Sequence, residues 1–155
     1  MSNPFTRLAF PEYEFRLKKS DEKAFIFDDI RKKWIVCTPE EWVRQNLIKF
    51  LIIELKFPIN YIAVEKGLKI AGREFRFDAL VYDRKFKPLV VVECKAPEIA
   101  LDQDVFDQVL HYNYEINAPF FLITNGFGFI MGQISSEKGV EFLEKPPMFD
   151  DLIVM

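Results

Sequence analysis

Two charged residues interrupt an apolar run in the segment VVVECKAPE, residues 90–98. Three consecutive valines predict a buried strand, and alternate side chains of a strand point to the same face. Glu93 and Lys95 therefore share one face, while Cys94 points to the other. Burying two neighbouring charges costs several kcal/mol unless they are paired or bind something. This strand is thus expected to carry chemistry as well as structure.

A second carboxylate reaches the same point if two apolar strands form a hairpin. Asp78 lies in REFRFDALVYD, and the segment DRKFKP that follows indicates a turn. A loop of residues 84–87 pairs Asp83 with Pro88, and the same register pairs Asp78 with Glu93. A slip of one residue would break this arrangement. In the predicted register the Cβ atoms of opposed residues are about 4.5–5.5 Å apart.

Two carboxylates at that separation repel each other unless a proton or a cation lies between them. Mg²⁺ prefers oxygen ligands and keeps several waters, and Mn²⁺ is the alternative ion. A lysine beside the ion can orient or deprotonate a water, and its ammonium group stabilises developing negative charge. Asp78, Glu93 and Lys95, spaced as D-x14-E-x-K, are therefore the parts needed for metal-activated water to attack a phosphodiester.

The elements around this pattern predict an α/β domain with a central mixed sheet. The runs at residues 13–19 and 23–29 alternate and indicate an N-terminal β-hairpin, followed by a short strand at 31–37. The segment FFLITN is a continuous apolar run, suited to the middle of a sheet. The other expected elements are strands at 61–70, 73–83, 88–95, 120–125 and 127–134, with a helix at 102–117 and a hairpin turn at Asn125–Gly126. The secondary structure of the tail at 140–155 is ambiguous from the sequence.

The strongest predicted helix covers residues 38–57, TPEEWVRQNLIKFLIIELKF. Thr38 is a good N-cap, and Glu41 completes a capping box three residues later. Pro58 is expected to end the helix. The second helix, at 102–117, can connect two parallel strands in the right-handed sense.

Composition restricts the function classes. The chain has 155 residues, 50% of them hydrophobic, and we expect one domain over residues 1–155. The net charge is −3, so contacts with an anion must come from local patches. Cys37 and Cys94 have no disulfide or zinc spacing, which predicts reduced thiols in the cytoplasm. The start, MSNPFTRLAF, lacks the apolar core of a secretion signal, and no segment is long enough to span a membrane.

The pattern resembles the PD-(D/E)xK nuclease superfamily and, more narrowly, the N-terminal nuclease-like domain of type I restriction enzyme R subunits. The stretches that carry the resemblance are IRKKWIVCTPEEWVRQNLI, FRFDALVYDRKFKPLVVVECKAPE, DQVLHY and ITNG, roughly residues 30–126. Phe77 stands where the superfamily name has proline. The resemblance implies a restriction-endonuclease-like fold with flanking helices and a core at about 38–130. It also implies Mg²⁺-dependent hydrolysis of DNA.

The resemblance also assigns roles to single residues. Asp78 and Glu93 match the metal carboxylates, Lys95 matches the catalytic lysine, and the main-chain carbonyl of Cys94 matches a further metal ligand. The family also supplies a glutamate from the first helix. Glu40 is favoured because it lies on the helix face directed at the sheet, although its neighbour Glu41 remains the alternative.

Further candidates come from the flanking segments. Gln108 and Tyr112 match a Q-x3-Y pattern, and their i, i+4 spacing places both on one helical face, where they would position substrate. Arg76 could bind a phosphate or steady the carboxylates. Glu65 and the basic run at 31–33 are better explained as exposed positions, and His111 as a surface residue.

Three functions therefore compete. The leading one is a Mg²⁺-dependent DNA endonuclease of restriction-modification or DNA-repair type. The alternative is a nucleic-acid-binding or accessory module that keeps the nuclease fold without cutting, and the third is a structural protein whose charged cluster is an internal salt bridge. The chain has no nucleotide-binding motif, so separate motor or specificity subunits are expected partners beside DNA. The sequence does not distinguish DNA from RNA as the substrate. It also leaves the sequence preference and the oligomeric state undetermined.

Overall fold

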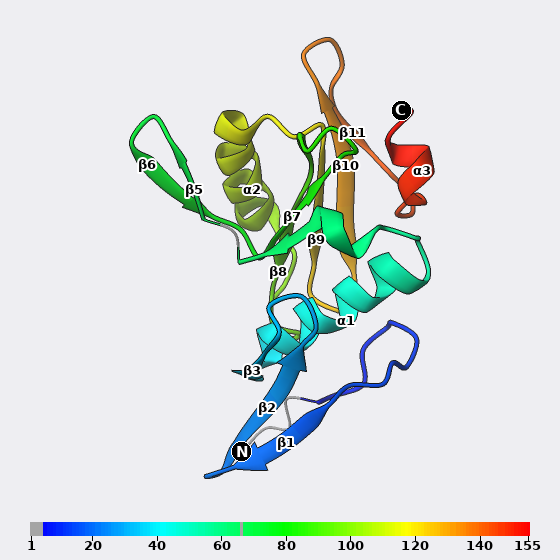
Figure 1. The fold of residues 1–155 in the computed structure, drawn as a ribbon. Coiled ribbons are helices and arrows are strands. Elements are labelled where there is room, and N and C mark those ends of the chain that lie inside the picture. The colour runs from blue at the N-terminus through cyan, green and yellow to red at the C-terminus, as the bar shows by residue number, and fades with distance from the viewer. Residues whose placement is uncertain (1–4, 66) are drawn as a thin grey trace.

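The centre of the protein is a six-stranded mixed sheet in the order β11-β10-β9-β8-β7-β4 (Figure 1). The computed structural model describes residues 5–65 and 67–155. Residues 1–4 and Lys66 lie outside this range. Residues 1–4 begin the segment expected to lack a secretion signal, and Lys66 belongs to the strand expected at 61–70. The strands of the central sheet are β4 (Ile62–Val64), β7 (Ala79–Tyr82), β8 (Pro88–Cys94), β9 (Phe120–Thr124), β10 (Phe129–Ser135) and β11 (Gly139–Phe142).

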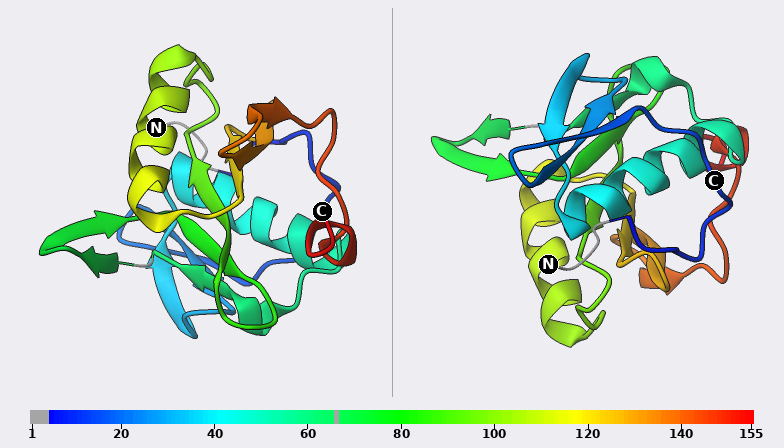
Figure 2. Two further views of the ribbon diagram at one scale, coloured as in Figure 1. Left: turned by 90° about the horizontal axis from the view of Figure 1, so that it is seen from above. Right: turned by 90° about the horizontal axis from the view of Figure 1, so that it is seen from below.

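Two long helices cover opposite faces of this sheet (Figure 2). Helix α1 (Pro39–Ile53) packs on the face that carries Val90 and Val92, and helix α2 (Gln103–Ile116) packs on the face that carries Val91. Helix α2 connects β8 to its parallel neighbour β9, as the sequence predicts. A strand buried on both faces reads as an unbroken apolar run, which explains the valines of β8.

Helix α1 begins as predicted, but it ends before the predicted proline. The Thr38 side chain accepts a hydrogen bond from the Glu41 N–H at 3.1 Å and caps the helix. The helix ends at Ile53 instead of continuing to residue 57. Lys56 adopts a left-handed conformation with φ of 61°, so the chain turns away before it reaches Pro58.

The β7–β8 hairpin has the predicted register near the carboxylates. Ala79 pairs with Val92, and continuing this register by one residue brings Asp78 opposite Glu93. The predicted pairing of Asp83 with Pro88 is wrong, because Tyr82 pairs with Pro88 across a β-bulge. A bulge adds one unpaired residue to a strand, and here it lies at the turn end of the hairpin, away from the carboxylates.

Two strands predicted as continuous are each divided between two sheets. The segment at 61–70 forms β4 and β5 (Gly67–Ile70), and the segment at 73–83 forms β6 (Arg73–Arg76) and β7. Strands β5 and β6 pair with each other as a separate ribbon that projects from the body (Figure 1). Glu65 has a φ of 50°, which redirects the chain between β4 and β5. The second break places Asp78 at a bend directly before β7.

The predicted N-terminal hairpin is part of a three-stranded antiparallel sheet. Strands β1 (Leu17–Ser20), β2 (Lys23–Asp28) and β3 (Lys33–Val36) pair in chain order. The sheet lies beside α1 and extends away from the central sheet (Figure 1). Since β3 leads directly into the cap of α1, this small sheet is anchored next to the start of that helix.

The remaining segments complete the ends of the fold. The turn at Asn125–Gly126 belongs to a four-residue loop, because Thr124 pairs with Phe129. The tail, left open by the sequence, forms β11 and a short helix α3 (Phe149–Leu152), and η1 (Ile59–Tyr61) is a single 3-10 turn. Cys37 and Cys94 are free and buried. In the described part of the chain, no helix has the length and apolar character needed to cross a bilayer.

Candidate metal and catalytic site

The three residues of the D-x14-E-x-K pattern converge at one end of the β7–β8 hairpin. Asp78 precedes β7, Glu93 lies near the end of β8, and Lys95 follows that strand. The carboxyl groups of Asp78 and Glu93 are within hydrogen-bonding reach of each other. The Lys95 Nζ lies 3.5 Å from a Glu93 carboxylate oxygen. The sequence prediction that these side chains meet on one face is therefore confirmed.

Asp78 is held in place through both of its carboxylate oxygens. Its Oδ2 accepts a hydrogen bond from the Cys94 N–H at 2.6 Å, and its Oδ1 lies 3.4 Å from the guanidinium of Arg44. Charge-assisted hydrogen bonds of this kind are shorter and stronger than neutral ones. The two contacts come from β8 and α1, so the position of this carboxylate depends on both elements.

The carboxylates open into a cavity of about 220 Å³ that is lined by Glu65, Arg76, Phe77, Asp78 and Glu93. Glu93 and Asp78 are 14% and 13% exposed, so most of each side chain is shielded from solvent. Arg76 enters this lining from the end of β6, which agrees with its predicted place beside Asp78. The cavity has room for several waters at about 30 Å³ each.

Burial, followed by the charge of Asp78, raises the pKa of Glu93 from 4.5 to about 8, although Lys95 acts in the opposite direction. Glu40 is affected in the same way, since burial and then the charge of Asp78 raise its pKa and the charge of Lys95 lowers it. The pair formed by Asp78 and Glu93 therefore tends to retain a proton near neutral pH. A cation between the two carboxylates would replace this proton.

This shift predicts a pH dependence of stability in protein kept free of divalent cations. Folded Glu93 holds its proton up to about pH 8, whereas the unfolded chain loses it near 4.5. The folded state binds more protons in that interval, so the free energy of unfolding should fall as pH rises, by at most about 1.4 kcal/mol per pH unit. Urea denaturation in EDTA across the interval measures the slope. Glu93→Gln should flatten it, and an unchanged slope in this variant would contradict the assignment.

The structure separates the two glutamates that the sequence left as alternatives. The charge of Asp78 raises the pKa of Glu40, and the charge of Lys95 lowers it. Glu41 is only 4% exposed, and its carboxylate pairs with Arg31 and Arg44. The Glu41 carboxylate does not accept a hydrogen bond from the main-chain N–H of Thr38, which a capping box requires. Two arginines bind this carboxylate more strongly than a main-chain N–H would. Glu41 is thus engaged by arginines, and the preference for Glu40 stays a prediction.

A buried network of arginines and carboxylates lies behind the site. Arg31 contacts Asp28 at 2.7 Å, Glu41 at 3.0 Å and Glu65 at 2.8 Å. The expectation that the basic run at 31–33 is a solvated turn is wrong for Arg31, whose side chain is only 14% exposed. The neighbouring Lys32 and Lys33 are exposed. Arg31 thus connects the β2–β3 loop to the helix and to the rim of the cavity.

Arg44 is the residue of this network that sequence reasoning missed. It contacts Glu41, Glu65 and Asp78, and it is 5% exposed. A signal was present in the sequence, because Arg44 lies four residues after Glu40 and three before Leu47, on the helix face directed at the sheet. A charge on such a face needs partners, and the carboxylates provide them.

Gln108 and Tyr112 lie on one face of α2, as predicted, and the Gln108 amide donates to the Tyr112 hydroxyl at 3.2 Å. The Tyr112 ring packs edge-on against Phe77, the residue before Asp78. Among the described residues, neither side chain contacts Asp78 or Glu93 directly. Their placement is compatible with a contact to substrate at the rim of the site. His111 is exposed, as expected.

The donor atoms fit a hard divalent cation that keeps several of its waters. Two carboxylates face a polar cavity, and the Cys94 carbonyl leaves β8 on the same side as the N–H that binds Asp78. No group of three or more His, Cys, Asp or Glu side chains within residues 5–65 and 67–155 meets the spacing of a metal site. Main-chain oxygen and water would therefore complete the coordination, and the role of Glu40 as a ligand stays a prediction.

Most of the chain is similar to a known protein family. The family model described as type I restriction enzyme R protein N terminus (HSDR_N) matches residues 39–147. This chain belongs to that family. The matched range includes α1, the β7–β8 hairpin with its carboxylates, and α2, so every site residue predicted from the sequence lies inside the family domain.

A solved structure is similar to the HSDR_N chain in fold. It is a fragment of a protein assigned as the HsdR subunit of a type I restriction enzyme from Vibrio vulnificus YJ016, with a TM-score of 0.54 and 21% sequence identity. The match covers 69% of this chain and 23% of that one, so this chain spans less than a quarter of the length of that structure. Among curated proteins, none is significantly similar in sequence.

Proposed function

We propose that this HSDR_N chain is a metal-dependent nuclease domain of the PD-(D/E)xK type that hydrolyses phosphodiesters in DNA. The observation that carries the proposal is the convergence of Asp78, Glu93 and Lys95 at a polar cavity. Arg44 and the Cys94 N–H already satisfy Asp78, so its place beside Glu93 is not explained by a need for a partner. Perturbed titratable groups in a cavity are typical of functional sites.

The roles of the residues follow from their positions. Asp78 and Glu93 would hold Mg²⁺ or Mn²⁺ together with the Cys94 carbonyl, with Glu40 as the further carboxylate. The bound ion would supply charge stabilisation and a water of lowered pKa. Lys95, 3.5 Å from Glu93, orients the attacking water and stabilises negative charge on the phosphate. Gln108 and Tyr112 position the substrate from α2, and Arg76 binds a phosphate oxygen at the cavity rim.

Family membership supports DNA as the substrate and restriction-modification as the context. The matched family and the similar HsdR fragment both belong to type I restriction enzymes. We therefore expect motor and specificity functions to reside in other domains or subunits. This assignment rests on the family and not on the cavity.

The second candidate is a nucleic-acid-binding or accessory module that keeps the fold and does not cut. The observation that favours it is the lack of a three-residue metal cluster in the described residues. Such a module would bind DNA without nicking it, with or without divalent ions.

The decisive experiment is incubation of supercoiled plasmid with the protein and Mg²⁺ or Mn²⁺, followed by separation of the nicked and linear forms. We expect nicking that requires the ion, and its loss in Asp78→Asn, which keeps the size of the side chain and removes its charge. The same ions should raise the melting temperature of the wild-type protein by mass action, and not that of the variant.

Two results would count against the proposal in different ways. Ion-dependent stabilisation without nicking would support the accessory module. If the ions neither stabilise the protein nor support nicking, the cluster is an internal salt bridge, which is the third interpretation of the sequence.

A further inference from the structure

The small N-terminal sheet has an outer face on which cations and aromatic rings alternate. Directly paired residues share a face of a sheet, and the register pairs Lys18 with Phe25 and Phe27 with Trp34. The opposite face buries Ile26 and Asp28 toward α1. We define the outer face by its members: Arg16, Lys18, Ser20, Lys23, Phe25, Phe27, Trp34 and Val36.

The cations of the outer face are held by aromatic rings and not by carboxylates. The Arg16 guanidinium lies 3.6 Å from the ring centroid of Phe27, and the Lys18 ammonium lies 4.3 Å from that of Trp34. Among the described residues, Arg16 and Lys18 have no acidic partner, whereas Arg31 and Arg44 are surrounded by carboxylates. A cation on a ring face keeps its charge and its donors for an anion. The outer face is thus a positive patch on a protein of net charge −3.

The aromatic side chains of this face contribute to neither of the two cores. Phe25, Phe27 and Trp34 are absent from both buried clusters of the described residues. Trp34 is 39% exposed, and Val36 is 43% exposed. The exposed ring of Trp34 and the half-buried rings of Phe25 and Phe27, beside uncompensated cations, suit a ligand that offers flat apolar faces together with negative charge. Unpaired bases on a phosphate backbone have both properties, whereas a duplex hides the faces of its bases.

We propose that the outer face of the β1–β3 sheet binds a single-stranded segment of DNA. Phosphates contact Arg16, Lys18 and Lys23, and bases stack at Phe25 and Trp34. Only three residues separate Val36 at the end of β3 from Glu40, a span of at most about 14 Å. Binding on this face does not require that the carboxylate site cuts.

The test measures binding of an oligothymidylate of about 15 nucleotides and of a duplex of equal length, by fluorescence anisotropy in EDTA. We expect the single strand to bind more tightly than the duplex at about 100 mM salt. The double variant R16Q/K18Q should weaken binding at least tenfold and reduce the slope of log K against log salt by about 1.4, or about 0.7 per charge removed. Trp34→Leu should weaken binding about tenfold without changing that slope.

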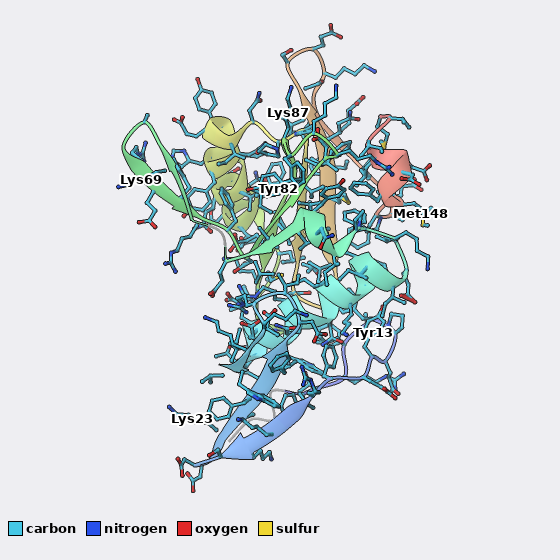
Figure 3. All side chains as sticks on the ribbon, viewed as in Figure 1. Tyr13, Lys23, Lys69, Tyr82, Lys87 and Met148 are labelled. Atoms are coloured by element: carbon cyan, nitrogen blue, oxygen red, sulfur yellow. The ribbon has the colours of Figure 1, made fainter. Side chains whose placement is uncertain are left out.

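The matched control is the double variant K85Q/K87Q, which removes the same charge from the β7–β8 turn. Lys87 lies at the opposite end of the molecule from Lys23 (Figure 3). Among the described residues, Lys85 and Lys87 likewise have no carboxylate partner, so the control differs in place and not in pairing. We expect it to bind the single strand as tightly as the wild-type protein does.

Three results would overturn the proposal. The first is equal weakening by the control, which would show diffuse electrostatics. The second is equal affinity for the duplex with no effect of Trp34→Leu, which would show a backbone contact only. The third is no binding of either probe at about 50 mM salt, which would show that the outer face does not bind DNA and would favour a protein partner instead. Because the measurement excludes divalent ions, none of these results depends on whether the protein nicks DNA.

Discussion

Lys95→Met is expected to lower the rate of plasmid nicking by about 10²- to 10⁴-fold, the range that a positioned proton-transfer group contributes. Methionine keeps most of the length of lysine and removes its ammonium group. The Lys95 Nζ lies 3.5 Å from Glu93, next to the pair of carboxylates, and the side chain is 22% exposed. A water bound at that pair would then lose the group that orients it. The change should appear in the rate at saturating Mg²⁺ and not in the concentration of Mg²⁺ required.

Metal binding separates this prediction from a loss of structure. Lys95→Met leaves Asp78 and Glu93 in place and removes a positive charge beside them, so Mg²⁺ should raise the melting temperature at least as much as in the wild-type protein. Lys87→Met is the matched control, because Lys87 lies at the opposite end of the β7–β8 hairpin. Nicking by Lys95→Met at the wild-type rate would remove the lysine from the mechanism.

Sequence reasoning placed the carboxylates correctly because the β7–β8 hairpin is a local structure. Its register depends on a short turn and on apolar residues that must face the core on both strands, and a slip of one residue would have exposed them. The bulge at Tyr82 was not predicted, yet it lies at the turn and leaves the pairing of Ala79 with Val92 unchanged. The part of the register that positions Asp78 is therefore the part that the core determines.

The breaks at Glu65 and Asp78 show where local reasoning fails. Alternation continues through YIAVEKGLKI and through REFRFDALVYD, so nothing in the pattern predicts that each run divides between two sheets. The positive φ of Glu65 is a property of a residue that binds Arg31 and Arg44 across the fold. Such contacts join residues that are distant in sequence, and periodicity carries no information about them.

The same limit explains why the arginine network was missed. Arg31 was interpreted from its basic neighbours, although its partners Glu41 and Glu65 come from the helix and from the rim of the cavity. Burial changes what an arginine requires, because a buried guanidinium needs carboxylate or hydrogen-bond partners and an exposed one does not. Arg44 provides the clearest test of how much this network contributes.

Arg44→Met is expected to lower the free energy of unfolding by about 3–5 kcal/mol, the cost of removing one partner from a buried ion pair. The variant leaves the carboxylate of Glu41 at 4% exposure with fewer cations around it. It also releases the Oδ1 of Asp78. Urea denaturation measures the loss of stability. Plasmid nicking under conditions where the variant remains folded should also decrease, because Asp78 is then held by the Cys94 N–H alone.

Two further variants show whether the loss arises from uncompensated charge. Arg84→Met breaks the exposed pair with Asp150, which is 2.6 Å long, and should cost less than about 1 kcal/mol, since solvent already screens these charges. Adding Glu41→Gln to Arg44→Met should restore part of the lost stability, because the double variant no longer buries the orphaned carboxylate. If the two single changes instead add without coupling, the network contributes packing and not charge compensation. In that case Asp78 would depend on β8 more than on α1 for its position.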